Sequence, residues 1–268
     1  MSYETQNGVA LITGASAGIG AIYADRLVKR GYDLILVARD ERKLEALSDR
    51  LTKETGRSVR PLRADLTDKA DLANVERVLR EEETVTMLVN NAGIAEITPL
   101  LDTDVRKVDE MIALNVTALS RLTYAAAPAF AARGRGTIIN VASIKGIAPE
   151  ELNGVYGATK AYVIALSHSL QYELADKGVR IQAVLPGATA TDLWEKAGLH
   201  WQNLPESIVM PTEVMVDAAL AGLDHGELVT IPGLHDGDEW TRFESARVAI
   251  SKLMHNSTSA PRYSATLS

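Results

Sequence analysis

Residues 9–20 of the chain read VALITGASAGIG, and this stretch decides the fold. Its first part, Val9 to Ile12, is a continuous apolar run, which is typical of a strand buried on both faces of a parallel sheet. A helical pattern follows the glycines at once and stops at Gly31. The glycines therefore lie in a strand-to-helix turn, where bare backbone can approach a pyrophosphate and the helix N-terminus supplies free N–H groups. The sequence predicts a phosphate-binding turn rather than one whose glycines serve geometry alone.

Six further apolar stretches alternate with helical patterns along the rest of the chain. They cover residues 33–38, 59–64, 87–89, 137–142, 179–185 and 228–231. Such alternation predicts a parallel sheet with helices on both faces. No proline- or glycine-rich linker, charge block or internal repeat divides the 268 residues, and 46% of them are hydrophobic, which is ample for one core. We therefore expect an α/β protein with a single domain over residues 1–268.

The composition excludes several classes of function. The chain has 28 Lys plus Arg against 35 Asp plus Glu, a net charge of −7 that argues against nucleic acid or anionic membranes as partners. It has no cysteine, and its five histidines lack metal-ligand spacing, so we expect no disulfide and no metal. Residues 1–8 carry no hydrophobic signal core, and residues 111–132 are interrupted by Asn115 and Pro128, so they predict an amphipathic helix rather than a membrane span. We expect a soluble, cytoplasmic protein.

Ser143, Tyr156 and Lys160 stand in the pattern S-x12-Y-x3-K. A tyrosine and a lysine four residues apart on a helix point to the same side. An ammonium fixed there favours the phenolate and lowers the tyrosine pKa from about 10, which gives an acid–base group that works near neutral pH. The serine hydroxyl can donate to the same substrate oxygen. Taken alone, the spacing is more typical of a solvated helix face, and the glycine turn upstream favours the catalytic interpretation.

The glycine turn has the spacing T-G-x3-G-x-G, which differs from the general dinucleotide fingerprint G-x-G-x-x-G. Further motifs follow it in the order Asn90-Asn91-Ala92-Gly93, Asn115, Ser143, Tyr156, Lys160 and Pro186-Gly187. From about Val9 to about Ile231 the chain resembles the short-chain dehydrogenase/reductase family. It is similar to the compact single-domain branch rather than to the nucleotide-sugar epimerases, which carry a T-G-x2-G-x2-G turn. The resemblance implies a doubly wound Rossmann fold with a seven-stranded, mainly parallel sheet.

The resemblance also implies a nicotinamide cofactor. Asp65 and Leu66 would read the adenine edge, although Asp65 also fits an ordinary turn ahead of a helix capped by Thr67. Residues 90–93 would pack beside the adenine ribose, and residues 186–191 would contact the carboxamide side of nicotinamide. The predicted cofactor-binding residues are Gly14, Ser16, Ala17, Gly18, Ile19, Gly20, Arg39, Asp65, Leu66, Asn91, Ala92, Gly93, Tyr156, Lys160, Pro186, Gly187, Thr189 and Thr191.

The end of the second strand indicates which nicotinamide cofactor binds. An NAD site would carry a carboxylate there for the ribose 2′-hydroxyl, whereas this chain has Ala38 followed by Arg39. The planar guanidinium of Arg39 can pair with a 2′-phosphate, so the sequence predicts NADP(H), with NAD(H) as a weaker alternative. Asp40 is one residue late and is expected to cap the next helix. Many NADP-preferring relatives carry a second basic residue in the glycine turn, where this chain has Ala17.

Asn115 lies inside the predicted helix 111–132, where an asparagine side chain competes with backbone hydrogen bonding. The resemblance implies that it holds a local break in the helix and a water that links Lys160 to solvent. The implied reaction is hydride transfer from NADPH to a carbonyl carbon, or the reverse oxidation of a secondary alcohol. Tyr156 would donate the proton and Ser143 would bind the substrate oxygen. Lys160 would lower the tyrosine pKa and bind the nicotinamide ribose.

Two other functions stay open at this point. An epimerase or dehydratase on the same fold would cycle the cofactor without net turnover, and a non-catalytic NADP-sensing regulator would use the binding site alone. Residues 192–211 carry two tryptophans and predict a mobile substrate lid, which suggests an apolar or aromatic carbonyl or alcohol substrate. Both tryptophans fit equally well a packing against the body of the protein or a neighbouring subunit. The Ser/Thr-rich tail, residues 256–268, is expected to be disordered. By resemblance we expect a homo-oligomer, a dimer or a homotetramer.

Overall fold

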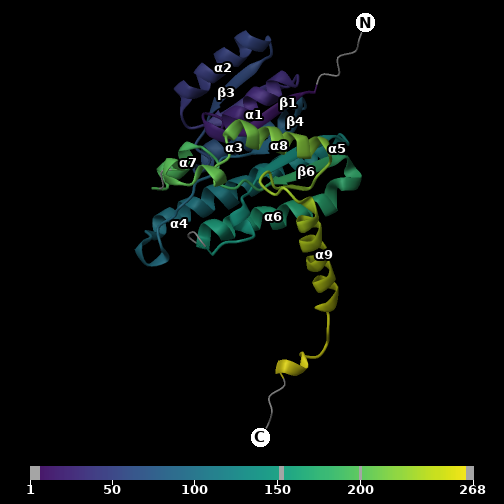
Figure 1. Ribbon diagram of the computed structural model, residues 1–268. Helices are drawn as coiled ribbons and strands as arrows, with labels where there is room; N and C mark the ends of the chain where they lie inside the picture. Colours follow the sequence, from purple (N-terminus) through teal and green to yellow (C-terminus); the bar gives the residue numbers. More distant parts are fainter. Residues whose placement is uncertain (1–6, 151–153, 199–200, 264–268) are drawn as a thin grey trace. The chain divides into compact units, whose positions relative to one another are not determined.

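The computed structural model describes residues 7–150, 154–198 and 201–263, and it forms two units, Met1–Gly233 and Leu234–Ser268. The first unit holds a seven-stranded parallel sheet in the order β3-β2-β1-β4-β5-β6-β7. Helices flank this sheet (Figure 1). The predicted doubly wound fold is confirmed. The strands are β1 Val9–Thr13, β2 Asp33–Ala38, β3 Val59–Arg63, β4 Val85–Asn90, β5 Gly136–Val141, β6 Val179–Val184 and β7 Val229–Thr230.

The strand order reverses direction between β1 and β4, which are neighbours in the sheet although two strands separate them in the chain. In open α/β sheets, this switch point leaves a crevice at the carboxyl ends of the strands. Thr13, Ala38 and Asn90 end their strands directly before the turns that carry the sequence motifs.

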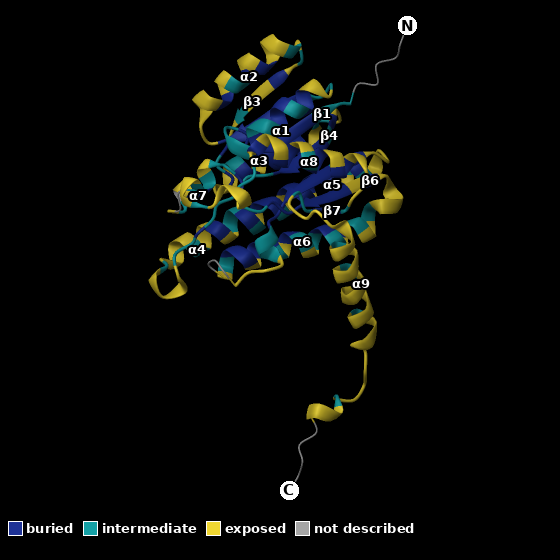
Figure 2. Ribbon diagram, viewed as in Figure 1, coloured by how far each residue is buried: buried dark blue, intermediate teal, exposed yellow. Residues whose placement is uncertain are grey.

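Helices cover both faces of the sheet. Side chains of α1, α2 and α8 form one apolar cluster with the sheet, and side chains of α3, α5 and α6 form the other. The strands at the centre of the unit are mostly buried (Figure 2). The described helices of this unit are α1 Gly18–Lys29, α2 Glu41–Thr55, α3 Lys69–Glu81, α4 Val105–Ile112, α5 Leu119–Ala132, α6 Gly154–Leu174, α7 Asp192–Lys196 and α8 Thr212–Asp224.

Local capping residues fix where two of these helices begin. Asp40 caps α2 by accepting a hydrogen bond from the backbone N–H of Lys43, as the sequence predicts. The expected cap of α3 by Thr67 is wrong. The Asp68 side chain caps this helix through the N–H groups of Ala70 and Asp71, because its carboxylate is one residue closer to the orphan donors of the first turn.

The helix predicted at residues 111–132 is interrupted. It divides into the end of α4, a π-helix at Ala113–Ala118 and α5. Asn115 lies inside the π-helix, so the local break that the resemblance implied at this residue is present. In a π-helix each backbone hydrogen bond spans five residues instead of the four of an α-helix. Such turns occur frequently at functional sites.

The second unit consists of α9, Gly237–Leu253, and a short 3-10 turn at Pro261–Tyr263. Asp236 caps α9 through the N–H of Asp238, and Trp240 stacks on Phe243 with ring centroids 5.1 Å apart. Residues 264–268 of the predicted tail lie outside the described part of the chain. Among the helices that the structure describes, none is both long and apolar enough to cross a bilayer.

Candidate active site

A pocket of about 600 Å³ opens at the carboxyl ends of the strands, where the sheet order reverses. It runs from the turn after β2 to Ser143 and Tyr156. Of the predicted site residues, all line it except Gly20 and Asn115, which lie behind the wall. The structure therefore brings motifs from six separate strand ends into one cavity.

The glycine turn leaves room and hydrogen-bond donors for a phosphate group. Gly14 and Gly18 have φ angles of 66° and 54°, a region that side chains other than glycine rarely adopt. A Cβ on Gly20 would lie 2.3 Å from the carbonyl oxygen of Gly14, so Gly20 lets the helix pack closely on the turn. Ala17, at the N-cap of α1, makes no side-chain cap hydrogen bond, and the first turn has no acidic residue. The positive end of α1 is therefore open toward an anion.

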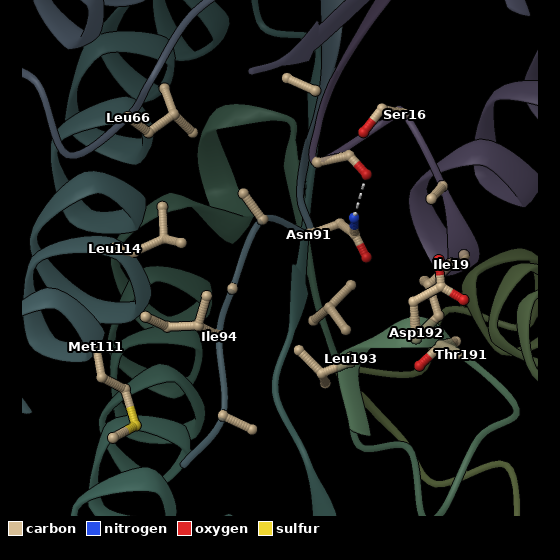
Figure 3. A pocket seen from close by; sticks show the side chains of 18 of the residues that line it. Ser16, Ile19, Leu66, Asn91, Ile94, Met111, Leu114, Thr191, Asp192 and Leu193 are labelled. Carbon is tan, nitrogen blue, oxygen red and sulfur yellow. Dashed lines mark hydrogen bonds between the residues drawn. The ribbon is translucent and has the colours of Figure 1, made fainter. Parts of the chain in front are cut away.

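The turn after β4 is braced against the glycine turn. The Thr13 hydroxyl accepts hydrogen bonds from the N–H groups of Asn91 and Ala92 at 2.9 and 3.0 Å, and it donates to the carbonyl of Val89. The Asn91 amide donates to the carbonyl oxygens of Thr13 and Gly14, the second bond being drawn in Figure 3. These bonds join β1 and β4 at the switch point and fix the pocket floor.

The far end of the pocket is basic and open to solvent. Arg39 and Lys43 both line it, and both are exposed. The Arg39 guanidinium lies 3.9 Å from the Asp65 carboxylate. Partial burial raises the pKa of Asp65, but hydrogen bonds from Thr67 and the charge of Arg39 outweigh this effect and leave the pKa below its usual value. The end of β2 thus presents cations, as the pair Ala38 and Arg39 predicts.

Ser143, Tyr156 and Lys160 form a buried cluster at the other end. Ser143 follows β5 and is hydrogen-bonded to the Tyr156 hydroxyl, and its own hydroxyl accepts from the N–H of Lys145. Lys160, one turn after Tyr156 on α6, donates from Nζ to the carbonyl of Val141 at 2.9 Å. Its Nζ lies 5.8 Å from the centre of the Tyr156 ring. The three side chains therefore meet as their spacing predicts.

The predicted lowering of the tyrosine pKa is not found. Burial raises the pKa of Tyr156 to about 12, and the hydrogen bond from Ser143 offsets only part of this effect. Burial also lowers the pKa of Lys160 to about 8, since the same dry surroundings disfavour its ammonium form. The sequence prediction counted the neighbouring charge and omitted desolvation, which is the larger effect for both groups.

Asn115 connects the π-helix to the wall beside Lys160. Its side chain accepts from the N–H of Ile94 at 2.9 Å and donates to the carbonyl of Ile94 at 2.8 Å. It also donates to the Thr159 hydroxyl, one residue before Lys160. A Cβ on Gly93 would lie 3.1 Å from Asn115 Oδ1 and 3.7 Å from Lys160 Nζ, so Gly93 keeps this junction clear. Asn115 is thus buried next to the lysine, where the predicted proton relay needs it.

The segment after β6 forms the remaining wall. Thr189 and Thr191 line the pocket with Pro186 and Gly187, and the Trp194 indole donates to the carbonyl of Thr189 at 3.1 Å. Trp194 is only 9% exposed. The predicted lid, residues 192–211, contains α7 and two 3-10 turns, and residues 199–200 lie outside the described chain. Its role as a mobile lid stays a prediction.

Several pocket residues have no signature in the sequence. Lys43 approaches the pocket because the first turn of α2 follows Arg39 directly. Glu96 and Lys107 form an ion pair on the wall, but they are separated in the chain and match no motif. Ile94, Met111 and Leu114 lie on one side of the pocket, across from Leu193 and Asp192 (Figure 3). A basic residue in the first turn after a strand-end arginine could have indicated Lys43; nothing local indicated the others.

Comparison with known proteins assigns the chain to a class. The family model described as short chain dehydrogenase matches residues 8–200. The chain belongs to the short-chain dehydrogenase/reductase family, and the protein is an oxidoreductase of that family.

Three relatives narrow the comparison. A short-chain dehydrogenase from Sphingobium yanoikuyae, solved in complex with NADPH, is 47% identical with a TM-score of 0.93, covering 96% of this chain and 99% of its own. The bulky-bulky ketone specific alcohol dehydrogenase from Comamonas testosteroni is 43% identical with a TM-score of 0.89, covering 97% and 99%. A very-long-chain 3-oxoacyl-CoA reductase of Anas platyrhynchos is 33% identical over 188 residues, which are 69% of this chain and 60% of that protein.

Proposed function

We propose that this protein is an NADP(H)-dependent oxidoreductase that transfers hydride between nicotinamide and a carbonyl compound or secondary alcohol. One observation carries the proposal. The buried, hydrogen-bonded pair of Ser143 and Tyr156, with Lys160 beneath it, closes a pocket whose other end carries Arg39 and Lys43. A group that handles protons and a cationic end for a phosphate thus share one cavity.

The residues present fit NADP(H). The uncapped N-terminus of α1 would hold the pyrophosphate, and Arg39 with Lys43 would hold the 2′-phosphate. Asp65 and Leu66, which line the pocket, would contact the adenine, while Thr189 and Thr191, which also line it, would contact the carboxamide. When bound, the cofactor supplies the hydride or accepts it. Support for NADP(H) over NAD(H) also comes from the Sphingobium yanoikuyae relative, which was solved with NADPH.

Tyr156 is the proposed general acid and base. In the reduction its hydroxyl gives a proton to the alkoxide oxygen that develops at the substrate, while Ser143 donates a hydrogen bond to the same oxygen. Lys160 stabilises the resulting phenolate through its charge and returns a proton to it. Asn115 completes the route to solvent through a water beside Lys160. In the oxidation each residue acts in reverse.

The substrate end favours an apolar or aromatic carbonyl compound. Met111, Leu114, Leu193 and Trp194 give it an apolar lining. The likeness to an alcohol dehydrogenase specific for bulky-bulky ketones supports ketones with two large substituents. An epimerase or dehydratase, or an NADP-sensing regulator, would use the same binding residues. The Ser143, Tyr156 and Lys160 cluster favours the oxidoreductase over the regulator.

The test is consumption of NADPH by the purified protein against a panel of ketones and aldehydes of increasing size. We expect oxidation of NADPH with bulky aryl ketones, one equivalent for each carbonyl reduced. An epimerase or dehydratase would convert its substrate without net loss of NADPH, and a regulator would bind NADPH and leave every carbonyl unchanged. Either result would contradict the proposed function.

A further inference from the structure

A buried carboxylate lies on the pocket wall outside the proton-transfer cluster. Glu96 is 5% exposed and lines the pocket. Its Oε1 accepts hydrogen bonds from the N–H groups of Ile97 and Thr98, at 3.0 and 2.9 Å, and from the Thr98 hydroxyl. Its Oε2 lies 2.8 Å from Nζ of Lys107, which comes from α4 and also lines the pocket. Every polar contact of this carboxylate is thus supplied by one loop and one lysine.

This ion pair belongs to the substrate end of the pocket. Glu96 comes three residues after Gly93, which adjoins Asn115 and Lys160. Lys107 is on α4, which packs against α6, the helix that carries Tyr156. Arg39 and Lys43 project into the pocket from the turn after β2 and the first turn of α2, at the opposite end.

At the substrate end, none of the described lining residues offers an unpaired cation that could bind an anionic substrate. Among the described lining residues, the cationic side chains are Arg39, Lys43, Lys107 and Lys160. The first two serve the far end, Lys160 is buried beneath Tyr156, and Lys107 is held by Glu96. Two more carboxylates line the pocket: Glu110, on α4 with Lys107, and Asp192, at the start of α7.

The contacts of Glu96 favour the charged form of its carboxylate. Burial alone would raise its pKa, but hydrogen bonds from Lys107 and Thr98 outweigh burial and lower the pKa to about 2. Because the Glu96 side chain is only 7% exposed, water screens its charge less than that of an exposed carboxylate, although its partner Lys107 is 60% exposed. A second anion placed beside it is therefore repelled, and it has no counter-charge to displace.

We propose that Glu96 is a specificity-determining residue that restricts this enzyme to substrates uncharged near the carbonyl, by holding the ammonium of Lys107 and repelling anions. The inference rests on the proposed function. It assigns ketones, aldehydes and secondary alcohols without an adjacent carboxylate as the substrate class. It excludes 2-oxo acids, whose carboxylate is bonded to the reacting carbon.

A matched pair of probes tests this selection: methyl benzoylformate and benzoylformate share one skeleton and differ by a charge beside the ketone. Each is titrated calorimetrically into protein saturated with NADP⁺, and kcat/KM is measured for both with NADPH. We expect the ester to bind at least about tenfold more tightly than the acid. Glu96→Gln frees the charge of Lys107 and should narrow this ratio about tenfold, whereas Lys107→Gln leaves Glu96 unopposed and should widen it.

The ester-to-acid affinity ratio should change in opposite directions in the two variants. A purely structural role would not give this result, because a loosened loop would weaken the binding of both probes in both variants. Glu110→Gln, a control on the same wall whose carboxylate is exposed, should change the ratio less than about twofold. Three results would overturn the proposal. The wild-type protein could bind ester and acid equally, the affinity ratio could shift in the same direction in both variants, or the ester could fail to bind. Preferential binding of the ester without turnover would instead contradict the proposed reaction and leave the charge selection standing.

Discussion

The two ends of the pocket bind charge in opposite surroundings. At the cofactor end, the Arg39 side chain is 60% exposed, and its nearest anionic neighbour, Asp65, lies at 3.9 Å. At the catalytic end, Lys160 is 7% exposed, and its Nζ donates to the carbonyl of Val141. The Arg39 guanidinium is therefore largely accessible to solvent, whereas the Lys160 ammonium is shielded by the protein.

This difference decides which physical effect governs each end. An exposed cation contributes little binding free energy until a partner displaces its water. The open end therefore acts by recognising an anionic group of the cofactor. Burial shifts the proton affinity of ionisable groups. At the closed end it raises the pKa of Tyr156 to about 12 and lowers the pKa of Lys160 to about 8, so this end acts through proton affinities. Substitutions at the closed end should therefore change rates and proton uptake, and those at the open end should change cofactor choice.

The largest expected effect comes from Tyr156→Phe at the closed end. Removing the hydroxyl removes the proton donor, so kcat on the best ketone should fall about 10²- to 10⁴-fold while NADPH binding is kept. Steady-state kinetics and a fluorescence titration of NADPH measure the two quantities. Tyr162→Phe is the control, since this tyrosine lies on the same helix, outside the pocket lining, and is paired with Ser120. A Tyr156 variant with more than a tenth of the wild-type kcat would contradict the assignment.

A second test concerns the proton on Lys160. Its pKa is lowered from 10.5 to about 8 on folding, so between these values the unfolded chain binds more protons than the folded one. The free energy of unfolding should therefore rise with pH across this window, by about 3 kcal/mol in total for this residue. Chemical denaturation between pH 7.5 and 10 should show this rise in the wild-type protein relative to Lys160→Met.

Tyr156→Phe provides the control for that measurement, because it keeps the lysine and should keep the slope. Tyr156 itself contributes with the opposite sign at higher pH: its folded pKa, about 12, exceeds 10.0, so its contribution to stability is lost as pH rises through that range. Identical pH slopes for the wild-type protein and Lys160→Met would show that Lys160 is hydrated, and the contrast between the two ends would then fail.

At the open end, Arg39→Ala should weaken NADPH binding and leave NADH binding nearly unchanged. A charge-assisted hydrogen bond contributes roughly 1.5–3 kcal/mol, which corresponds to about 10- to 150-fold in affinity. Adding Ala38→Asp should reverse the preference by placing a carboxylate at the ribose 2′-hydroxyl. Arg42→Ala, an exposed arginine of α2 outside the pocket lining, is the control. Equal losses for both cofactors would remove Arg39 from the 2′-phosphate site.

Trp194 tests whether the segment after β6 belongs to the closed end. Trp194→Phe removes the indole donor from the carbonyl of Thr189 and should lower the free energy of unfolding by about 1 kcal/mol. Trp201→Phe, at a half-buried site, should cost less. A Trp194 variant with unchanged stability and a raised KM would favour the mobile lid instead.

The sequence predicted the fold and the meeting of Ser143, Tyr156 and Lys160 because both rest on local patterns. Apolar stretches 33–38 and 179–185, for example, agree with β2 and β6 to within a residue. The glycine turn and the spacing of Tyr156 and Lys160 are fixed by one turn and one helix. Features that depend on tertiary packing could not be predicted from the sequence. Burial of Tyr156 reversed the expected direction of its pKa shift, and no pattern shows how much water a folded pocket excludes.

The pair of Glu96 and Lys107 shows the same limit on a longer scale. Lys107 comes eleven residues after Glu96 in the chain. Their side chains meet because the loop after β4 folds against α4. Neither residue stands in a motif, so only the packed structure identifies them as pocket residues. If this pair selects the substrate, as we propose, family motifs predict the reaction better than the substrate.

The smallest expected effect is that of Lys43→Ala, and it sharpens the contrast most directly. Lys43 is an exposed cation at the same open end as Arg39, but its ammonium lacks the planar fork that pairs with a phosphate in two places. An exposed pair contributes about 0.2–1 kcal/mol, so NADPH affinity should fall less than about fivefold, with no change for NADH. Because salt screens exposed charges, this loss should shrink when ionic strength is raised from 0.01 to 0.15 M. A tenfold or larger loss that persists at high salt would show that Lys43 becomes buried around the phosphate, and the open end would then resemble the closed one.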